Sequence, residues 1–257
     1  MKPNRVQLII SIVLLVVILA ACGKSPASTP SGSGTAAPAS KASSGDCANA
    51  YYPVAAGDSW SYSSSGGNLG DYTYTQKITA ANGTGFTKSY AASTGVDLSI
   101  DWKCSGGNLA ALDAGAAGLS MSTSKITMTS NSIQADGYNI PASFNSGATW
   151  SEKVSATGTV VEGSTSKTVT SQIAYQLDCS AGGTDAVTVP AGKFDAVKAV
   201  CTKETTVSAV VQGKTIQLGD NKENITYWYA KGVGFVKSVA SGGSNNETVV
   251  LTQYTAN

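Results

Sequence analysis

Histidine is absent from this 257-residue chain, and arginine occurs only once, at Arg5. Without histidine, Ser-His-Asp and Cys-His nucleophile systems cannot form, and the chain lacks the commonest general base near neutral pH. Beyond residue 5 the chain has no guanidinium group for bidentate recognition of phosphate or carboxylate. These absences exclude the most common designs of hydrolase active sites.

Charged residues are also scarce, at 13% of the chain. Once Lys2 and Arg5 are removed with the N-terminal segment, 15 lysines face 16 acidic residues, so the net charge is about −1. A nucleic-acid partner requires a basic surface, and the sequence shows no basic run that could provide one. We therefore expect no nucleic-acid partner.

The N-terminus has the plan of a secretory signal. A basic stretch precedes the apolar run 6–21, which ends in Leu19-Ala20-Ala21-Cys22. As a helix this run would cover about 24 Å of a hydrocarbon core about 30 Å thick, which is short for a permanent span. The last four residues resemble the lipobox of bacterial lipoproteins, which implies cleavage before Cys22 and a lipid on its thiol. The alternative is an uncleaved anchor with an incidental cysteine.

Residues 23–45 are mostly Gly, Ser, Ala, Thr and Pro, a composition that cannot offset the entropy of ordering and predicts a flexible tether. The expected organisation is a signal peptide at 1–21, the lipidated Cys22 with its tether at 22–45, and an extracytoplasmic domain at 46–257. This places the protein in the cell envelope, on the extracytoplasmic face of a bacterial membrane. Gly23 is not the aspartate that favours inner-membrane retention, and the choice of membrane stays open.

Alternation of apolar and polar residues with a period of two recurs along the domain and predicts half-buried strands. Examples are residues 59–62, 71–75, 96–102, 125–129, 196–200 and 248–254. Turn clusters rich in Gly and Asn separate roughly a dozen such strands. Only residues 108–118 are interpreted as a short helix. The expected fold class is all-β, an antiparallel curled sheet or β-barrel-like domain.

A faint internal repeat suggests two similar halves, 46–140 and 141–257. Pro53 precedes Gly57-Asp58-Ser59-Trp60, and Pro141 precedes Gly147-Ala148-Thr149-Trp150. Each tryptophan opens a stretch of strands, so Trp60 and Trp150 are expected to be buried equivalents. Chance similarity in a chain rich in Gly and Ser is the alternative explanation.

The four cysteines after Cys22 predict two disulfides, because an even number in an exported chain is typical of them. A metal site is the alternative, but CxxC spacing is missing and no histidine is available. Val189-Pro190-Ala191-Gly192 fits a type I turn. A hairpin about Pro190 and Ala191 places Cys179 nearly opposite Cys201, within disulfide range, unless the Gly182-Gly183 stretch breaks the register. Cys47 with Cys104 follows by elimination.

Three motifs carry a family resemblance: residues 51–62 (YYPVAAGDSWSY), 189–194 (VPAGKF) and 227–237 (YWYAKGVGFVK). Their order resembles the signposts of a family of uncharacterised bacterial surface lipoproteins with a β-rich domain of unknown function. The resemblance covers about residues 50–240 and implies a β-barrel-like fold but no activity. Lys231 stands where the family commonly has proline, which leaves that turn less rigid.

The sequence contains only weak candidates for catalytic groups. Ser-Lys catalysis would need pairs such as Ser122 with Lys125 or Ser164 with Lys167, whose strand spacing points the two side chains to opposite faces. Paired carboxylates could support glycoside hydrolysis. Six of the acidic residues lie beside turns and are interpreted as solvated turn formers: Asp58, Asp71, Asp113, Asp136, Asp178 and Asp220. We expect no enzyme activity, no metal and no cofactor.

Aromatic residues are the remaining candidates for ligand binding. The pairs Trp60 with Tyr62, Tyr72 with Tyr74, and Tyr227 with Tyr229 each share one face of a strand, and Trp228 faces the other way. They either fill the core, the favoured interpretation, or line a groove that holds sugar or acyl chains.

The function expected is a non-enzymatic binding module for an apolar or glycan ligand or for an envelope partner protein. The alternative is a structural or assembly accessory subunit of the envelope, and an envelope hydrolase comes third. Besides the membrane, reached through the N-terminal lipid, the expected partners are therefore a lipid, a glycan or an envelope protein.

Overall fold

The computed structural model describes residues 44–67, 70–112, 121–122, 126–162, 167–211, 214–242 and 246–255. The predicted signal peptide, Cys22 and nearly all of the tether lie outside these residues. Within them the chain forms a short 3-10 turn, Gly45–Cys47, and thirteen strands. The strands are β1 (Ser59–Ser65), β2 (Tyr72–Asn82), β3 (Gly85–Ala92), β4 (Asp97–Ser105), β5 (Asn108–Ala111), β6 (Met121–Ser122), β7 (Ile126–Gly137), β8 (Thr149–Glu162), β9 (Lys167–Val189), β10 (Gly192–Val211), β11 (Lys214–Ala230), β12 (Gly234–Ser241) and β13 (Thr248–Thr255).

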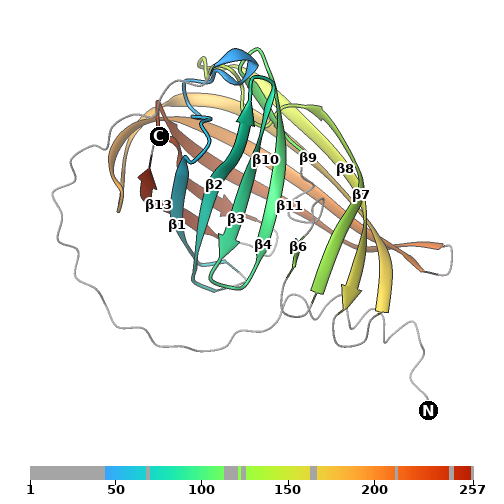
Figure 1. The fold of residues 1–257 in the computed structure, drawn as a ribbon. Coiled ribbons are helices and arrows are strands. Elements are labelled where there is room, and N and C mark those ends of the chain that lie inside the picture. The colour runs from blue at the N-terminus through green and yellow to red at the C-terminus, as the bar shows by residue number, and fades with distance from the viewer. Residues whose placement is uncertain are drawn as a thin grey trace.

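All thirteen strands belong to one antiparallel sheet that curls round on itself (Figure 1). The order is β3-β2-β1-β13-β12-β11-β10-β9-β8-β7-β6-β4, with β5 beside β4, and β3 also pairs with β4. The seams are uneven, because three residue pairs join β12 to β13 and only two join β4 to β6. The sheet is therefore an almost closed barrel, which confirms the predicted fold class. Strands β7 to β11 extend beyond the shorter strands β1 to β4 (Figure 1).

The core lies on the inner face of this sheet because the sequence alternates. In β4, Leu98, Ile100, Trp102 and Cys104 are buried, and the residues between them are exposed. Successive side chains of a strand point to opposite faces, so a period of two in hydropathy becomes one apolar and one polar face. The curling of the sheet brings these apolar faces together into one core.

The β9–β10 hairpin has the register that the sequence predicts. Val189 pairs with Gly192, so the turn is Pro190-Ala191, and a bulge beside Gly182 and Gly183 then shifts the pairing by one residue. This shift places Cys179 directly opposite Cys201, and the two form a disulfide with their Cα atoms 4.1 Å apart. The glycine pair does break the register, but in the direction that aligns the cysteines.

The helix expected at residues 108–118 is wrong where the structure describes this stretch. Asn108–Ala111 is strand β5, paired with β4 through a two-residue turn at Gly106-Gly107. Both glycines have positive φ, 55° and 85°, which is the conformation that a tight type I′ hairpin requires. The Gly106-Gly107 pair favours a hairpin, and this preference outweighs the weak helical propensity of the residues that follow.

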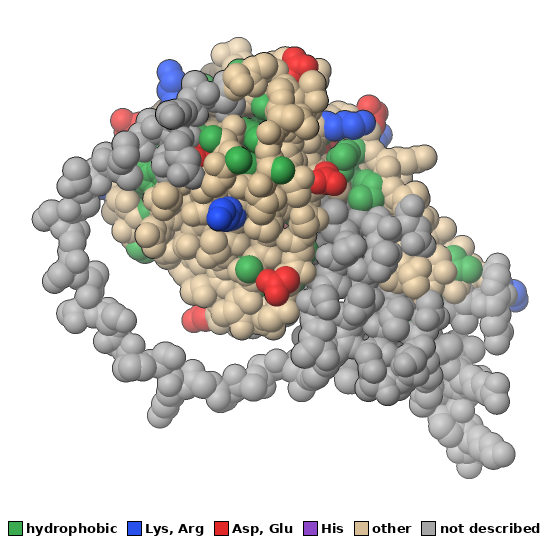
Figure 2. All heavy atoms as spheres, in the orientation of Figure 1, with side chains coloured by type: hydrophobic (Ala, Val, Ile, Leu, Met, Phe, Trp, Pro, Cys, Tyr) green, Lys and Arg blue, Asp and Glu red, His purple; other side chains and the backbone are tan. Residues whose placement is uncertain are grey.

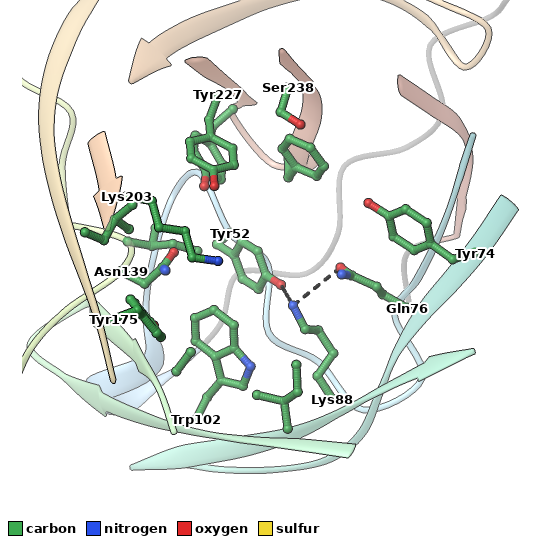
Figure 3. Close-up of a pocket in the computed structure, with 16 residues that line it drawn as sticks. Tyr52, Tyr74, Gln76, Lys88, Trp102, Asn139, Tyr175, Lys203, Tyr227 and Ser238 are labelled. Atoms are coloured by element: carbon green, nitrogen blue, oxygen red, sulfur yellow. Dashed lines mark hydrogen bonds between the residues drawn. The ribbon is translucent and has the colours of Figure 1, made fainter. Parts of the chain in front are cut away.

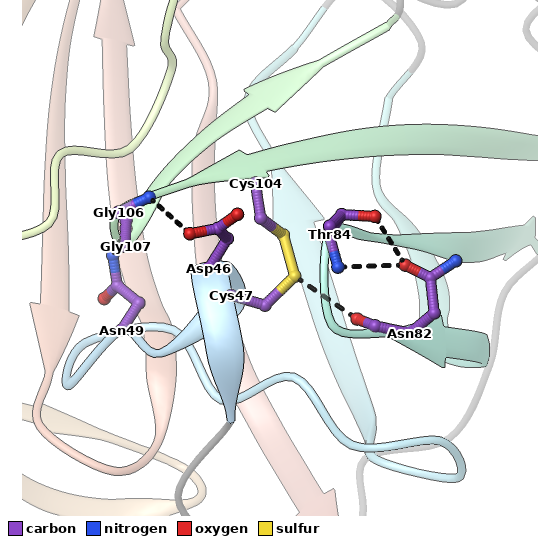
Figure 4. Close-up of a disulfide and its surroundings, with 8 residues drawn as sticks. All are labelled: Asp46, Cys47, Asn49, Asn82, Thr84, Cys104, Gly106 and Gly107. Carbon is purple, nitrogen blue, oxygen red and sulfur yellow. Dashed lines mark hydrogen bonds between the residues drawn. A yellow bond between two sulfur atoms is a disulfide. The ribbon is translucent and has the colours of Figure 1, made fainter.

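The segment before β1 closes one end of the barrel. Cys47 is bonded to Cys104 at the end of β4, as Figure 4 shows, and this is the second predicted disulfide. The Asn49 side chain donates hydrogen bonds to the carbonyl oxygens of Gly107 and Pro141, at 2.8 and 2.9 Å. The Gly232 amide donates to the Ala50 carbonyl at 2.8 Å. This end segment, residues 45–58, thus binds three different turns at the same end of the barrel.

Trp60 and Trp150 occupy comparable positions. Each is the second residue of its strand, β1 or β8, each is buried, and each indole N–H donates to a backbone carbonyl, of Val233 or Asn139. Their burial agrees with the prediction. The strands themselves form one continuous sheet, and the division into halves at residues 140 and 141 stays a prediction.

The outer surface carries scattered charge. On the face drawn in Figure 2, lysines and acidic side chains are scattered singly or in small groups among other residues. Val200 is the only large hydrophobic residue that is exposed among those whose side chains the structure describes, which within the strands leave out residues 121–122, 126–131, 160–162, 167–168, 211 and 218. Among those same residues, no helix has the length and apolar character needed to cross a membrane.

Candidate functional site

A cavity of about 310 Å³ lies inside the barrel, next to the end segment (Figure 3). Its wall combines aromatic and aliphatic side chains with a few polar ones. The lining residues are Tyr52, Tyr74, Gln76, Lys88, Ile100, Trp102, Ala111, Asn139, Ile140, Tyr175, Leu177, Lys203, Tyr227, Tyr229, Phe235 and Ser238. The end segment contributes Tyr52, whose ring stacks on those of Trp60, Phe86 and Trp102 at centroid distances of 6.0, 6.2 and 5.8 Å. Tyr52 therefore forms the floor of the cavity.

The cavity opens on the side away from the end segment. Ile78, Cys201 and Tyr229 are buried, whereas the inward-facing residues two positions further from that segment, Gln76, Lys203 and Tyr227, are half-buried. These three lining residues are thus more accessible than the inward-facing residues next to the end segment, although Tyr74, two positions beyond Gln76, is buried again. A ligand could enter the cavity from that side.

The structure divides the predicted aromatic residues between lining and core. Tyr74, Tyr227 and Tyr229 line the cavity, and Trp60 and Tyr62 are core residues close to it. The remaining two do not belong to the site. Tyr72 donates to Glu247 at 2.8 Å, and Trp228 lies on the outer face, where it donates to Asp185 at 2.9 Å under the Lys237 ammonium group.

Lys88 and Lys203 were not identified from the sequence as lining residues. The alternation of apolar and polar residues nevertheless places both on the inward face of their strands. Lys88 lies in phase with the buried Phe86, and Lys203 lies in phase with the buried Cys201. A lysine in the inward phase of a strand is unusual, because lysine is almost never fully buried without a partner.

Lys88 is buried, with 5% of its surface exposed. Its ammonium group donates to the Tyr52 hydroxyl at 2.9 Å and to Gln76 Oε1 at 3.4 Å, as Figure 3 shows. It also lies 4.7 Å from the ring centroid of Trp102, a distance typical of a cation–π interaction. Every one of these partners is neutral.

Buried Glu152 holds three lining residues in place from behind the wall. Its carboxylate accepts hydrogen bonds from the Ala111 amide at 3.0 Å, the Asn139 side chain at 3.2 Å and the Tyr175 hydroxyl at 2.5 Å. Three donors satisfy a carboxylate that would otherwise be costly to bury. Glu152 therefore fixes the wall without itself lining the cavity.

The lining tyrosines are neutral hydrogen-bonding groups. Burial is the main cause that raises the pKa of Tyr74, Tyr227 and Tyr229, and neighbouring phenols or carboxylates raise it further. A phenol with a raised pKa stays protonated at neutral pH. These side chains can donate and accept hydrogen bonds or stack against a ligand, but they provide no nucleophile.

The other candidate groups do not converge on the cavity. Lys125 and Ser164 lie outside the described residues, so both Ser-Lys pairs stay untested, and Asp113 lies outside them too. Asp58 is not solvated as expected: it is fully buried and accepts from the Ala55 amide at 3.0 Å, because the end segment folds over it. Asp71, Asp136, Asp178 and Asp220 are exposed. No cluster of three metal-binding side chains occurs in the described part of the chain.

The fold and the cavity define a class of protein, an almost closed antiparallel barrel with one covered end and an aromatic interior. A model of the DUF3108-like family matches residues 74–249, so the chain belongs to that family. This agrees with the expected membership of a β-rich family without an established activity. Comparison with curated proteins gave no match.

Two solved structures resemble the chain. One is a "putative lipoprotein" from Parabacteroides distasonis ATCC 8503, 16% identical, with a TM-score of 0.50. The other is a "putative exported protein" with a YmcC-like fold from Bacteroides fragilis NCTC 9343, 14% identical, with a TM-score of 0.48. In both comparisons 80% of this chain and 99% of the other are covered. At such identities the likeness concerns the fold alone.

Proposed function

We propose that this protein is a lipid-anchored, extracytoplasmic binding protein of a bacterial envelope that holds a small ligand inside its barrel and has no catalytic activity. The observation that carries the proposal is the aromatic cavity beside Tyr52. Its volume of about 310 Å³ is at the lower end of the range for small-molecule sites, which suits a small ligand better than a whole lipid.

The distribution of apolar surface supports a ligand over a protein partner. A docking face for an envelope protein would expose a contiguous apolar patch, whereas Val200 is the only large exposed hydrophobic residue among those whose side chains the structure describes. The aromatic side chains lie inside the barrel instead. The same distribution counts against the role of a structural or assembly subunit.

The chemistry of the lining supports binding rather than catalysis. Its polar groups are amides, neutral phenols, one serine and two lysines, and the buried carboxylate of Glu152 is engaged with three donors. General acid–base catalysis would require a group whose pKa lies near the working pH. Neutral phenols with raised pKa values do not meet that requirement.

The lipobox-like sequence before Cys22 supports the proposed location. The two disulfides agree with it, because such bonds persist in oxidising compartments outside the cytoplasm. The tether predicted at residues 23–45 would keep the barrel clear of the lipid surface.

The proposal is tested with the mature chain carrying Cys22→Ser, which keeps every other mature residue and removes the lipid. We expect the neutral fluorophore N-phenyl-1-naphthylamine to bind once per chain, with saturation and a blue shift of its emission. Ser238→Phe should lower the affinity at least about tenfold, because the added ring occupies space that the fluorophore needs. Mass spectrometry of protein extracted from native envelopes should also show a co-purified small molecule.

Ser99→Phe is the matched control, because Ser99 is exposed on β4 and the same substitution there leaves the cavity unfilled. Absence of saturable fluorophore binding in the folded parent would contradict the proposal. Equal affinities of the Ser238→Phe and Ser99→Phe variants would contradict it too.

A further inference from the structure

We infer that the cavity binds the anionic end of a small amphiphilic acid, with the carboxylate on Lys88 and the apolar body against the aromatic wall. This inference rests on the proposed function, because it names the class of ligand for the same cavity. Three features of the described residues carry it. One N–H of Lys88 has no acceptor among them, the lining contains lysines but no acidic residue, and the rest of the wall is aromatic and aliphatic.

The Lys88 ammonium group has three donors and uses two of them, on Tyr52 and Gln76. No third acceptor lies within hydrogen-bonding distance among the described residues. A buried ammonium group loses its hydration, and neutral oxygens compensate for that loss less well than an anion does. The third donor is therefore available to a ligand that enters the cavity.

Charge in the lining is of one sign. Lys88 and Lys203 both belong to it, and the lining contains no aspartate or glutamate. The ammonium group of Lys203 lies 5.3 Å from the ring centroid of Tyr175, and Figure 3 shows it reaching into the cavity from the side opposite Lys88. The two ion pairs found over the described ranges, Lys198–Asp185 and Lys222–Glu204, involve neither lysine. The Glu152 carboxylate lies behind the wall and is engaged by three donors, so an anionic ligand would supply a counter-charge within the cavity itself.

The rest of the wall suits an apolar body. Trp102, Ile100 and Leu177 contribute apolar surface to it, and the rings of Phe235 and Tyr229 lie together at a centroid distance of 6.1 Å. Lysine acts as a point charge, and the mature chain has no arginine fork for a phosphate group. A single carboxylate on a short apolar chain therefore matches the lining best.

The test is competition against N-phenyl-1-naphthylamine by three ten-carbon compounds that differ in the head group: decanoate, 1-decanol and decyltrimethylammonium. We expect decanoate to compete at least about tenfold better than 1-decanol, and the cation to compete least. Lys88→Met, which keeps the length of the side chain, should lower the decanoate affinity roughly ten- to hundredfold, as expected for loss of a charge-assisted hydrogen bond. The 1-decanol affinity of the same variant is the internal reference, so the ratio of decanoate to 1-decanol affinity should fall by the same factor whatever happens to the fluorophore affinity.

Lys77→Met is the matched control, because Lys77 is exposed on the adjacent strand β2 and its removal changes the net charge equally. Equal competition by decanoate and 1-decanol in the parent protein overturns the inference and needs no variant, so a folding defect of Lys88→Met cannot conceal it. Equal losses in the Lys77→Met and Lys88→Met variants overturn it as well. Failure of the fluorophore itself to bind refutes the proposed function instead.

Discussion

Three buried tryptophans differ in the partner of the indole N–H. Trp60 donates to the Val233 carbonyl at 2.7 Å and Trp150 to the Asn139 carbonyl at 2.9 Å. Trp102 is buried to the same degree, but its Nε1 has no acceptor among the described residues. An unpaired buried donor reduces stability, so equal burial does not mean equal contributions to folding.

Replacing each of these tryptophans with phenylalanine separates hydrogen bonding from volume. Trp60→Phe and Trp150→Phe leave a buried carbonyl unpaired, so each should cost about 1–3 kcal/mol more than Trp102→Phe, which removes an unsatisfied donor. Chemical denaturation of the three variants measures the order. Trp228→Phe, on the outer face, should cost least, and a larger cost there than at Trp60 would contradict the assignment of faces.

The buried tyrosines predict a loss of stability at alkaline pH. Burial raises the pKa of Tyr62, Tyr74 and Tyr229 above the value of about 10 for an unfolded tyrosine. Above pH 10 the unfolded chain releases protons that the folded chain retains, so the tyrosine contribution to the free energy of unfolding should be constant below about pH 10, and the free energy should fall above it. Denaturation at several pH values checks this. Ultraviolet titration should show a group of tyrosines that ionise only as the protein unfolds, and full ionisation near pH 10 without unfolding would refute the burial.

At the scale of elements, the end segment depends on the close approach of its Ala48 carbonyl oxygen to Gly107 in the β4–β5 turn. A Cβ on Gly107 would lie 2.7 Å from the Ala48 carbonyl oxygen and 3.0 Å from the Ala142 Cβ, whereas a Cβ on Gly106 would meet nothing within 4 Å. Both glycines have positive φ, so an alanine at either position carries the same kind of backbone strain. The two positions therefore form a matched pair that isolates the steric effect.

Gly107→Ala should destabilise the protein by about 1–3 kcal/mol more than Gly106→Ala, because the added methyl group must displace the end segment. Denaturation midpoints measure the difference. Hydrogen exchange should locate it, with faster exchange at residues 46–58 in Gly107→Ala alone. Similar hydrogen exchange in both variants would mean that the close contact between Gly107 and the end segment does not stabilise that segment.

The two disulfides are expected to act on different elements. Cys179–Cys201 joins two strands that already pair along nearly their whole length, whereas Cys47–Cys104 joins the end segment to β4 across 57 residues. Loop entropy alone gives about 3 kcal/mol for the shorter loop and about 4 kcal/mol for the longer one. Replacing both cysteines of the longer loop with alanine should therefore destabilise more and also expose the cavity floor at Tyr52.

Fluorophore affinity and hydrogen exchange distinguish the two bonds. The Cys47→Ala, Cys104→Ala variant should bind N-phenyl-1-naphthylamine more weakly and exchange faster at residues 46–58, while the Cys179→Ala, Cys201→Ala variant should do neither. A reversed pattern would show that the hairpin, not the end segment, maintains the cavity. Peptide mapping without reduction checks both pairings directly.

On the scale of the whole molecule, a single atom is expected to attach the barrel to its membrane. The Cys22 thiol is the site of the predicted thioether, so Cys22→Ser should give an uncleaved precursor or a released protein. Partition into a detergent phase is the measurement, with Lys24→Ser as a control that changes the tether but not the lipid site. A fully processed Cys22→Ser protein that partitions like the parent would disprove the lipid anchor.

The sequence by itself determined the all-β class, the faces of the strands and both disulfides. The class, the faces and the Cys179–Cys201 bond follow from local rules, because a period of two assigns each side chain to a face and the Pro190 turn sets the pairing of its own hairpin. The Cys47–Cys104 bond follows only by elimination. The same rules assigned Trp228 to the face opposite Tyr227 and Tyr229. They failed at residues 108–111, where the Gly106-Gly107 turn could have been interpreted as a hairpin.

Only the tertiary structure decided which inward-facing residues meet. The closure of the sheet pairs Ser59 with Thr255, and the end segment crosses the barrel end to place Tyr52 beside Lys88. Such contacts join residues far apart in sequence, and their pairing depends on the curl of the whole sheet rather than on any local pattern. A period of two predicts that Lys88 points inward. It cannot predict that the other residues lining the cavity include no aspartate or glutamate. The cavity and its positive charge are therefore properties of the closed barrel, not of any single strand.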